Sequence, residues 1–355
     1  MNVILPVAGL GLRMRPHTLH RPKALVHVAG DAVLGHVLDD LAGAVSADRW
    51  VFVVGHLGAQ VEAWVRRRHG ALDARFVVQP EPRGQADAIA LARAHLAGPV
   101  LIVFAADTVF DIDLAGLAAL PADADGAVHL MRVEDPGRFG VAVVGPDGAV
   151  TRFVEKPTAP VSDLAVVGVY HVRDGAWLAR AIDRLVAERP PTAGEHFLAD
   201  ALQVMVDEGA RLVARPVRAW VDCGTVPATL AAQRYLFERR ARAAAEPAGP
   251  TTSRIIPPVW IAPDAEVSGS VVGPYVHLGP GCRVAGSVVG PYVSLEGEAR
   301  VEGAVVRDVS GATGVAIRDA VVTGSLLGAG ATIAGTAARY NIGDGSTVHP
   351  RGGDP

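Results

Sequence analysis

The chain has 355 residues, of which 50% are hydrophobic, and a formal net charge of −4 at pH 7. This length suits one large domain with a smaller one, and the apolar content is ample for a buried core. The mildly acidic balance lacks the basic surface that nucleic-acid binding requires, so we expect no nucleic-acid partner. Two cysteines, Cys223 and Cys282, are too few for a disulfide framework or a structural zinc site.

The first residues do not resemble a secretion signal, because Pro6, Gly9, Gly11 and Arg13 interrupt the apolar run. The sequence also contains no uninterrupted stretch of about 18 apolar residues, the length that a membrane-spanning helix needs. We therefore expect a cytoplasmic protein with no membrane partner.

Apolar strands alternate with helices over the first 104 residues. Short apolar runs predict strands at 2–7, 50–54, 75–78 and 100–104, and helical spacing predicts helices at 33–41, 60–68 and 86–96. This alternation predicts an α/β domain with a Rossmann-like, mixed but mostly parallel sheet that is flanked by helices. Ligands of such sheets bind beyond the carboxyl ends of the strands, where residues 9–13 and Asp107 lie.

The character of the sequence changes near residue 246. Residues 246–254 are rich in turn formers and are predicted to link a first domain at 1–245 to a second domain at 255–355. Residues 269–276 read GSVVGPYV and return at 286–293, 17 residues later. Such repeats predict a β-solenoid, and aliphatic residues near every sixth position resemble the hexapeptide repeats of a small left-handed parallel β-helix. A β-sandwich with repetitive turns is the alternative.

Lysine is rare in this chain, which contains only Lys23 and Lys156. A site that needs a compact, flexible ammonium is one reason to keep lysine where arginine is otherwise preferred. Residues 8–13 read AGLGLR, and Arg21, Pro22 and Lys23 follow them. A glycine-rich turn after a first strand lets backbone N–H groups approach a polyphosphate. Here the chain resembles the sugar-1-phosphate nucleotidylyltransferases, whose opening motif has this order of glycines, arginine and Pro-Lys; read alone, the segment would be an ordinary strand turn.

The resemblance implies roles for five residues of this motif: Ala8, Gly9 and Gly11 bind the nucleotide phosphates, and Arg13 and Lys23 act on the leaving pyrophosphate. Ala8 is a variant of the first glycine that also occurs in the uridylyl branch of the family. Leu12 stands where the family usually has threonine, so one hydroxyl contact to the triphosphate is lost.

A second motif of the family runs from Gln79 to Asp87. The resemblance implies that Gln79 reads the edge of the base and that the backbone at Gly84 meets the base. Asp87 departs from the glutamine or histidine of thymidylyl and uridylyl enzymes, and residues 84–89, GQADAI, are closer to the GTADAI of ADP-glucose pyrophosphorylases. Without the surrounding motifs, the segment predicts only a turn that leads into a helix.

Two aspartates far apart in the sequence match the metal positions of the family. Asp107 follows the apolar strand at 100–104, and Asp222 lies in residues 220–225, WVDCGT. Mg²⁺ prefers hard oxygen ligands and typically takes one or two carboxylates with phosphate oxygens and water. The resemblance makes Asp107 and Asp222 the expected ligands of a Mg²⁺ cofactor, although a lone aspartate at a strand end is usually a turn or a helix cap.

The sugar 1-phosphate is expected at later segments. By resemblance, Gly140 offers its backbone to the sugar, Glu155 contacts a hydroxyl and Lys156 holds the sugar phosphate, with Gly168 in the same site. Residues 194–200, GEHFLAD, resemble the segment that borders the sugar pocket. Taken alone, Glu155 and Lys156 would be a solvated turn.

The resemblance covers residues 1 to about 240 and makes 1–245 a nucleotidyltransferase catalytic domain. It implies that a phosphate oxygen of a sugar 1-phosphate attacks the α-phosphorus of an NTP and gives an NDP-sugar and pyrophosphate. Glucose 1-phosphate with dTTP or UTP is the expected substrate pair. The C-terminal repeats resemble the long thymidylyl type, the opening loop favours uridylyl transfer, and Asp87 favours adenylyl transfer.

Two other functions fit the sequence. In a bifunctional nucleotidyltransferase and acyltransferase, the β-helix would carry acyl transfer, but it is short and contains only His277 and His349 as candidate bases. A non-catalytic regulatory subunit that senses nucleotide sugars is consistent with Leu12 and Asp87, whereas the two lysines and the metal carboxylates favour an enzyme. We expect the β-helix to serve assembly or regulation in a homo-oligomer.

Overall fold

The computed structural model describes residues 1–104, 108–113, 116, 120–159, 161–188, 194–241, 252–335 and 340–348. The chain divides into two compact units, Met1–Leu10 with Val37–Trp220 and Gly11–His36 with Val221–Pro355. The segment that follows the first strand therefore belongs with the C-terminal part of the chain. The division into a domain at 1–245, a linker at 246–254 and a domain at 255–355 stays a prediction. Asp107 and residues 246–251 of that linker lie outside the described residues.

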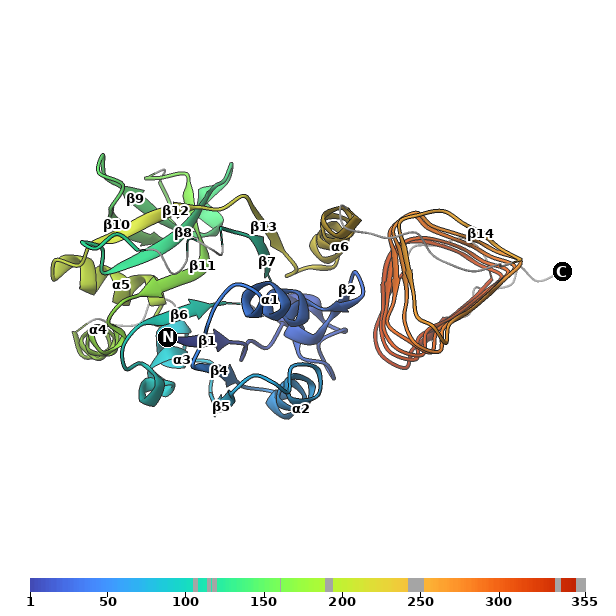
Figure 1. Ribbon diagram of the computed structural model, residues 1–355, viewed down its shortest axis with the longest axis horizontal. Coiled ribbons are helices and arrows are strands. Elements are labelled where there is room, and N and C mark those ends of the chain that lie inside the picture. Colours follow the sequence, from blue (N-terminus) through green and yellow to red (C-terminus); the bar gives the residue numbers. More distant parts are fainter. Residues whose placement is uncertain are drawn as a thin grey trace. The chain divides into compact units, whose positions relative to one another are not determined.

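A nine-stranded sheet forms the centre of the first unit. Its strands are β1 (Asn2–Pro6), β4 (Arg49–Val54), β5 (Ala74–Val78), β6 (Val100–Val103), β8 (Gly126–Arg132), β9 (Gly140–Val144), β10 (Val150–Glu155), β11 (Leu164–Val172) and β12 (Leu212–Pro216). Their order is β10-β9-β11-β6-β1-β4-β5, with β8 pairing β11 and β12 pairing β8. Strands β5, β4, β1 and β6 are parallel, while β11 is antiparallel to β6, β8 and β9. The mixed sheet with a parallel centre is thus confirmed (Figure 1).

Helices flank this sheet. They are α2 (Gly58–Arg68), α3 (Gln85–Leu91), α4 (Gly175–Glu188) and α5 (Leu198–Asp207), while α1 (Val33–Ala42) begins in the second unit and ends in the first. Two further strands are β7 (Thr108–Asp111) and β13 (Ala219–Asp222). Ile89 of α3, Leu202 of α5 and Ile102 of β6 belong to one buried core. All four residues of β6 are fully buried, as expected of a parallel strand that is covered on both faces.

The second unit is built around a parallel β-helix whose strands form three stacks. The first stack contains β14 (Arg254–Ile255), β17 (Val271–Val272), β20 (Val288–Val289) and the first residues of β23 (Val305–Gly311) and β25 (Val321–Leu327). The second stack contains β15 (Val259–Ile261), β18 (Val276–Leu278), β21 (Val293–Leu295), the last residues of β23 and β25, and β27 (Asn341–Ile342). The third stack contains β16 (Glu266–Ser268), β19 (Arg283–Ala285), β22 (Arg300–Glu302), β24 (Ala316–Arg318), β26 (Thr332–Ala334) and β28 (Thr347–Val348). Every ladder between these described strands is parallel, which excludes the β-sandwich.

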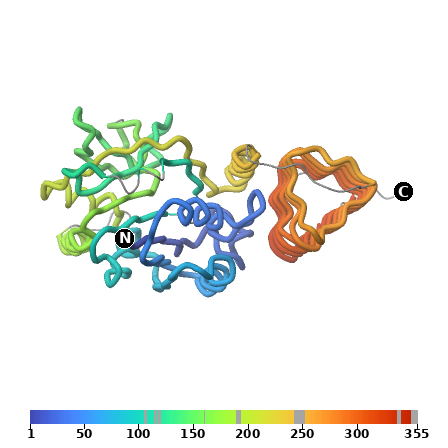
Figure 2. The backbone as a smooth tube through the Cα atoms, in the orientation of Figure 1, coloured from blue at the N-terminus to red at the C-terminus, as the bar shows by residue number. Residues whose placement is uncertain are grey.

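The repeated octapeptides lie in consecutive coils of this β-helix. Val271 pairs with Val288, and Val276 pairs with Val293, so the ladder places equivalent residues side by side. The inward-facing Val276 and Val293 are fully buried in a core that runs along the coils. Each coil has a triangular outline (Figures 1 and 2). The predicted parallel β-helix is confirmed, and its left-handed coiling stays a prediction.

Two other elements of the second unit pack on the β-helix. They are the antiparallel hairpin of β2 (His27–Val28) and β3 (Asp31–Ala32), and the helix α6 (Val226–Ala241). Gln233 of α6 is fully buried and joins all three parts. Its Nε2 donates hydrogen bonds of 3.0 Å to the carbonyl oxygens of Tyr292 and Val309, and its Oε1 accepts one of 3.4 Å from the amide of Ala29. Among the helices of the described residues, none is long and apolar enough to cross a membrane.

Candidate active site

The first phosphate-binding candidates follow β1 directly. At the end of β4, Gly55 lets the backbone of Ala8 approach closely, because a Cβ on Gly55 would lie 2.8 Å from the carbonyl oxygen of Ala8. Within the described chain, nothing lies within 4 Å of the place that a Cβ on Gly9 would occupy. Gly9 therefore presents open backbone beyond the carboxyl end of a parallel strand, where phosphate groups can approach.

The predicted base-reading segment is held by hydrogen bonds of its own. Gln79 is 7% exposed, and its Nε2 donates to the carboxylate of Asp87 at 2.8 Å and to the carbonyl oxygen of Gly84 at 3.2 Å. Gly84 has a φ of +108°, which only glycine adopts readily, and a Cβ there would lie 2.7 Å from the carbonyl oxygen of His196. The amide of Ala86 donates to that same oxygen at 2.9 Å. The predicted base-reading segment thus packs against His196, in the segment predicted to border the sugar pocket.

The predicted sugar-binding residues meet at the ends of β9 and β10. Gly140 pairs with Glu155 in the ladder, and a Cβ on Gly140 would lie 2.6 Å from Oε2 of Glu155. The side chain of Glu155 is 18% exposed, and Nζ of Lys156 lies 4.0 Å from its Oε1. Burial raises the pKa of Glu155, Lys156 lowers it, and Asp200 and Glu195 raise it further. This half-buried carboxylate is poised to accept hydrogen bonds from hydroxyl groups.

Lys156 directly follows β10, and Gly168 lies within β11 of the same sheet. Lys156 has a φ of +42° and a side chain that is 61% exposed, and its Nζ lies 5.7 Å from the centre of the Phe197 ring. Gly168 has a φ of +85° in β11, where the register to β8 shifts, and a Cβ there would lie 3.1 Å from Cβ of Phe104. Lys156 is therefore open to an anionic group, whereas the glycine at 168 is explained by close packing.

The second unit contains the rest of the phosphate-binding motif. Gly11 has a φ of +64°, and a Cβ there would lie 3.0 Å from Cγ2 of Thr18 and 3.2 Å from Cβ of Lys23. The hydroxyl of Thr18 donates a hydrogen bond of 2.7 Å to the carbonyl oxygen of Gly11. Lys23 begins a short 3₁₀ turn, Lys23–Leu25, and is 8% exposed. The glycine turn and the first lysine are thus packed against each other.

Arg13 and Asp222 converge on one glycine. A Cβ on Gly224 would lie 2.6 Å from Oδ1 of Asp222 and 2.8 Å from Nη2 of Arg13. The amide of Gly224 donates a hydrogen bond of 2.7 Å to the same Oδ1. The predicted metal ligand and the predicted phosphate-binding arginine are therefore brought together, and glycine is needed because both side chains occupy the space beside it.

The structure distributes the predicted residues over both units. The first unit holds Ala8, Gly9, Gln79, Gly84, Gly140, Glu155, Lys156 and Gly168, and the second holds Gly11, Arg13, Lys23 and Asp222. Asp107 is outside the described residues, and the described side chains include no group of three His, Cys, Asp or Glu residues that could hold a metal ion. The sequence predicted no separate role for His196, Gly55 or Gly224, although His196 lies in the segment 194–200 that was expected to border the sugar pocket. The only signal for Gly224 was its place in the family motif at 220–225.

Comparisons with known proteins agree with these motifs. The family model described as nucleotidyl transferase matches residues 1–239, and the chain belongs to this family. It is 30% identical over 296 residues to a glucose-1-phosphate thymidylyltransferase of Streptomyces antibioticus, covering 78% of this chain and 82% of that protein. It is 26% identical over 229 residues to a UTP–glucose-1-phosphate uridylyltransferase of Haloferax volcanii, covering 63% of this chain and 91% of that protein. The structure of a UDP-glucose pyrophosphorylase with UDP-glucose shares the fold, with a TM-score of 0.57, 21% identity, and 67% of this chain and 99% of that chain covered.

Proposed function

We propose that the protein transfers a nucleotidyl group from an NTP to a sugar 1-phosphate and releases pyrophosphate. The observation that carries this proposal is the position of residues 195–197. The backbone of His196 meets Gly84 of the base-reading segment, and the ring of Phe197 lies beside the ammonium of Lys156. One short segment thus joins the part expected to hold the base to the part expected to hold the sugar phosphate.

The reaction needs positioning and charge neutralisation more than acid–base chemistry. A bond forms between a phosphate oxygen of the sugar 1-phosphate and the α-phosphorus, and the bond from that phosphorus to the β-phosphate oxygen breaks. The attacking oxygen is already anionic, so no proton has to be removed. In this proposal Lys156 holds the attacking phosphate, while Arg13 and Lys23 stabilise charge on the departing pyrophosphate.

A divalent cation, in our proposal Mg²⁺, would be held by Asp222 and Asp107. The carboxylate of Asp222 offers the hard oxygen atoms that Mg²⁺ prefers, and the amide of Gly224 fixes its orientation. When bound, the ion would neutralise negative charge on the phosphates of both substrates. Nη2 of Arg13 lies 2.8 Å from the place of a Cβ on Gly224, and Arg13 would add positive charge beside Asp222.

We propose glucose 1-phosphate as the sugar phosphate and dTTP or UTP as the nucleotide. The two relatives act on glucose 1-phosphate by name, one as a thymidylyltransferase and one with UTP. Thymine and uracil both present an N–H donor between two carbonyl oxygens. Gln79 suits that pattern, because its Nε2 is occupied by Asp87 and Gly84 while its Oε1 remains to accept a hydrogen bond.

The test is a pyrophosphate-release assay with five NTPs against several sugar 1-phosphates. We expect the highest kcat/KM with dTTP or UTP and glucose 1-phosphate. Lys23→Ala should lower kcat by at least about 10²-fold, as the loss of an electrostatic group in an active site commonly does. Arg184→Ala, on the exposed surface of α4, is the matched loss of a positive charge and should leave kcat unchanged.

The same assay separates the alternatives. A regulatory subunit would release no pyrophosphate from any pair, and this outcome would contradict our proposal. For acyl transfer, the described part of the β-helix offers only His277, which is partly buried beside Gly30 and Arg240. We therefore expect no turnover of acetyl-CoA with glucosamine 1-phosphate. Assembly of the β-helix into a homo-oligomer stays a prediction.

A further inference from the structure

One outward-facing row of the β-helix is covered over most of its length, although its last residue, Asn341, is exposed. In the second stack, the middle residues of successive strands pair with one another: Trp260, His277, Ser294, Ser310, Leu326 and Asn341. We call these six residues the contact row. Ser294 and Ser310 are completely buried, whereas Val288 and Val305, which face outward on the first stack, are 44% and 41% exposed. Other segments of the same unit therefore pack on the contact row.

The partner is the segment that contains Lys23, together with α6. Trp260 stacks on Phe237 of α6, with ring centres 5.4 Å apart and an interplanar angle of 16°. At the other end of the contact row, Leu326 is buried in a cluster with Met14 and Val26. Next to it, the side chain of Asn341 is hydrogen-bonded to His17.

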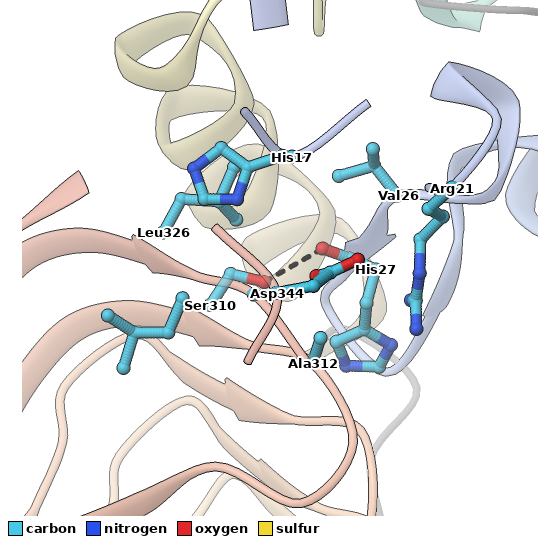
Figure 3. A pocket seen from close by; sticks show the side chains of 10 residues that line it. His17, Arg21, Val26, His27, Ser310, Ala312, Leu326 and Asp344 are labelled. Atoms are coloured by element: carbon cyan, nitrogen blue, oxygen red, sulfur yellow. Dashed lines mark hydrogen bonds between the residues drawn. The ribbon is translucent and has the colours of Figure 1, made fainter. Parts of the chain in front are cut away.

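Two serines hold the hairpin that follows Lys23. The hydroxyl of Ser310 donates a hydrogen bond of 2.7 Å to the carbonyl oxygen of His27, and Oγ of Ser294 lies 2.7 Å from Nε2 of His27 (Figure 3 shows Ser310 and His27). Oγ of Ser294 also accepts a hydrogen bond of 2.9 Å from the amide of Gly30. Since these groups are buried, loss of either hydroxyl leaves a polar partner unsatisfied.

An ion pair holds the same segment just before Lys23. Nη1 of Arg21 lies 2.8 Å from Oε2 of Glu296, with side-chain exposures of 21% and 31%. The amide of Thr313 in the next coil donates to the same oxygen at 3.0 Å, so Glu296 is fixed by the β-helix itself. Only Pro22 separates Arg21 from Lys23. The lysine is thus flanked by β-helix contacts on both sides.

The space between these anchors is small. A cavity of about 20 Å³, room for roughly one water molecule, is lined by His17, Arg21, Val26, His27 and Asp344 and by residues of the coils (Figure 3). At this place the Lys23 segment therefore packs closely on the coils.

We propose that the β-helix is a positioning element of the nucleotidyl-transfer site, in which Ser294, Ser310 and Glu296 hold the Lys23 segment in its active geometry. This inference rests on the proposed function, because Lys23 is assigned there to the leaving pyrophosphate. These three residues act through Lys23 and touch no substrate. Their loss lowers kcat, because charge on the leaving group develops in the transition state, and leaves KM for the sugar 1-phosphate unchanged.

The test compares two pairs of buried serines. Ser294→Ala with Ser310→Ala removes the hydroxyls that reach the Lys23 segment. Ser270→Ala with Ser287→Ala is the matched control, because those hydroxyls donate to Ser268 and Ala285 within the coils. We expect the first pair to lower kcat by roughly 3- to 10-fold per hydroxyl and the control pair to lower it less than twofold. Glu296→Gln, which keeps the shape but loses the charge beside Arg21, should lower kcat in the same direction.

Two readouts separate positioning from general damage. In a Lys23→Ala background, the Ser294 and Ser310 changes should have no further effect on kcat, since they act through that lysine. Hydrogen exchange of residues 17–30 should rise in the same pair and not in the control, whether or not the protein is active. Unchanged exchange, or an undiminished loss of kcat in the Lys23→Ala background, would overturn this inference. If the wild-type protein releases no pyrophosphate but hydrogen exchange still rises in the variant with Ser294→Ala and Ser310→Ala, the proposed function is overturned instead.

Discussion

Nε2 of Gln79 donates a hydrogen bond of 2.8 Å to Oδ2 of Asp87 in the first turn of α3. A carboxylate can only accept hydrogen bonds, and so can the carbonyl oxygen of Gly84, the other partner of Nε2. Both contacts therefore demand the same orientation of the Gln79 amide. Within the described residues, Oε1 of Gln79 accepts no hydrogen bond, so Asp87 and the carbonyl oxygen of Gly84 together present this oxygen to a ligand.

Replacement of Asp87 should weaken discrimination between bases. In Asp87→Ala only the longer hydrogen bond of 3.2 Å to the carbonyl oxygen of Gly84 still favours one orientation, so the amide of Gln79 can rotate more easily and offer its nitrogen. Cytosine carries an acceptor at N3 where uracil carries a donor, so CTP should gain most. We expect the ratio of kcat/KM for the preferred NTP to that for CTP to fall by roughly 10-fold, about the value of one hydrogen bond in a buried site.

The control for this change lies in the same loop. Glu81→Gln removes a charge that pairs with Arg83 at 2.8 Å on the exposed surface and does not touch Gln79. It should leave the ranking of the NTPs as it is. The interpretation of Asp87 fails if Glu81→Gln and Asp87→Ala change that ranking equally, or if Asp87→Ala leaves it unchanged.

Much of the first unit follows from local sequence. The apolar run at 100–103 is a buried parallel strand, and the alternation around it predicted the centre of the sheet. The antiparallel strand β11 was not predicted. It lies between β6 and β9 although it comes later in the chain than both, and such pairing over long separations leaves no local periodicity to detect.

The β-helix shows the same limit. The octapeptide repeat predicted its coils, because each coil repeats the same inward-facing valines. The contact row could not be predicted, since Trp260, His277 and Ser294 share no residue type and become one surface only when the coils stack. Of the site residues, Gly224 escaped notice because its role depends on Arg13, which is far away in the sequence.

Gly224→Ala should damage catalysis through crowding. The new Cβ would lie 2.6 Å from Oδ1 of Asp222 and 2.8 Å from Nη2 of Arg13, so both side chains must move. Misplacement of catalytic groups by about 1 Å can cost 10²-fold, and we expect kcat to fall roughly 10- to 100-fold with little change in Tm. Gly43→Ala, after α1, is the control, because its nearest neighbour would be the carbonyl oxygen of Asp39 at an ordinary 3.4 Å. Equal activity of the two variants would show that Arg13 and Asp222 are not part of the machinery.

Glu155→Gln should stabilise the protein at neutral pH and weaken sugar binding. Burial raises the pKa of Glu155 above its ordinary 4.5, so the folded state holds this proton more tightly than the unfolded chain does. The contribution of Glu155 to stability is therefore lost as pH rises through the raised pKa. At pH 7 the glutamine variant should have the higher Tm, and below pH 4, where the carboxyl is neutral, the two Tm values should converge.

The activity of Glu155→Gln should change in the opposite direction. KM for the sugar 1-phosphate should rise by roughly 10-fold, because a neutral amide replaces a charged hydrogen-bond acceptor. Glu188→Gln, an exposed change on α4, should alter neither the pH dependence of Tm nor KM. A Glu155→Gln variant that is less stable than wild type at pH 7 would show that burial of the ionised carboxylate does not lower the stability of the folded state.

Acid should weaken the joint between the β-helix and the Lys23 segment. Burial, together with His277, Arg21 and His36, holds the pKa of His27 well below 6.5. Burial and then Arg240 lower the pKa of His277 to about 4, opposed by a backbone hydrogen bond and by Asp31. Both imidazoles bind protons more readily in the unfolded chain than in the folded protein. The stability that the neutral imidazoles contribute is therefore fully present above pH 6.5 and is lost as the pH falls toward their pKa values in the folded protein. For His277 alone the loss between pH 6.5 and 4 is about 3 kcal/mol.

His277→Phe removes one of these two imidazoles and keeps a ring at the same place in the contact row. The fall in Tm between pH 7.5 and pH 5 should therefore be smaller in this variant than in wild type, because one proton-binding difference is gone. His56→Phe, at an exposed position, should keep the wild-type dependence. Protection of residues 17–30 against hydrogen exchange, expressed relative to the intrinsic rate at each pH, should fall with acid in wild type and fall less in His277→Phe. Equal pH dependence of His277→Phe and His56→Phe would contradict this account, because the imidazole of His277 would then carry no share of the acid sensitivity.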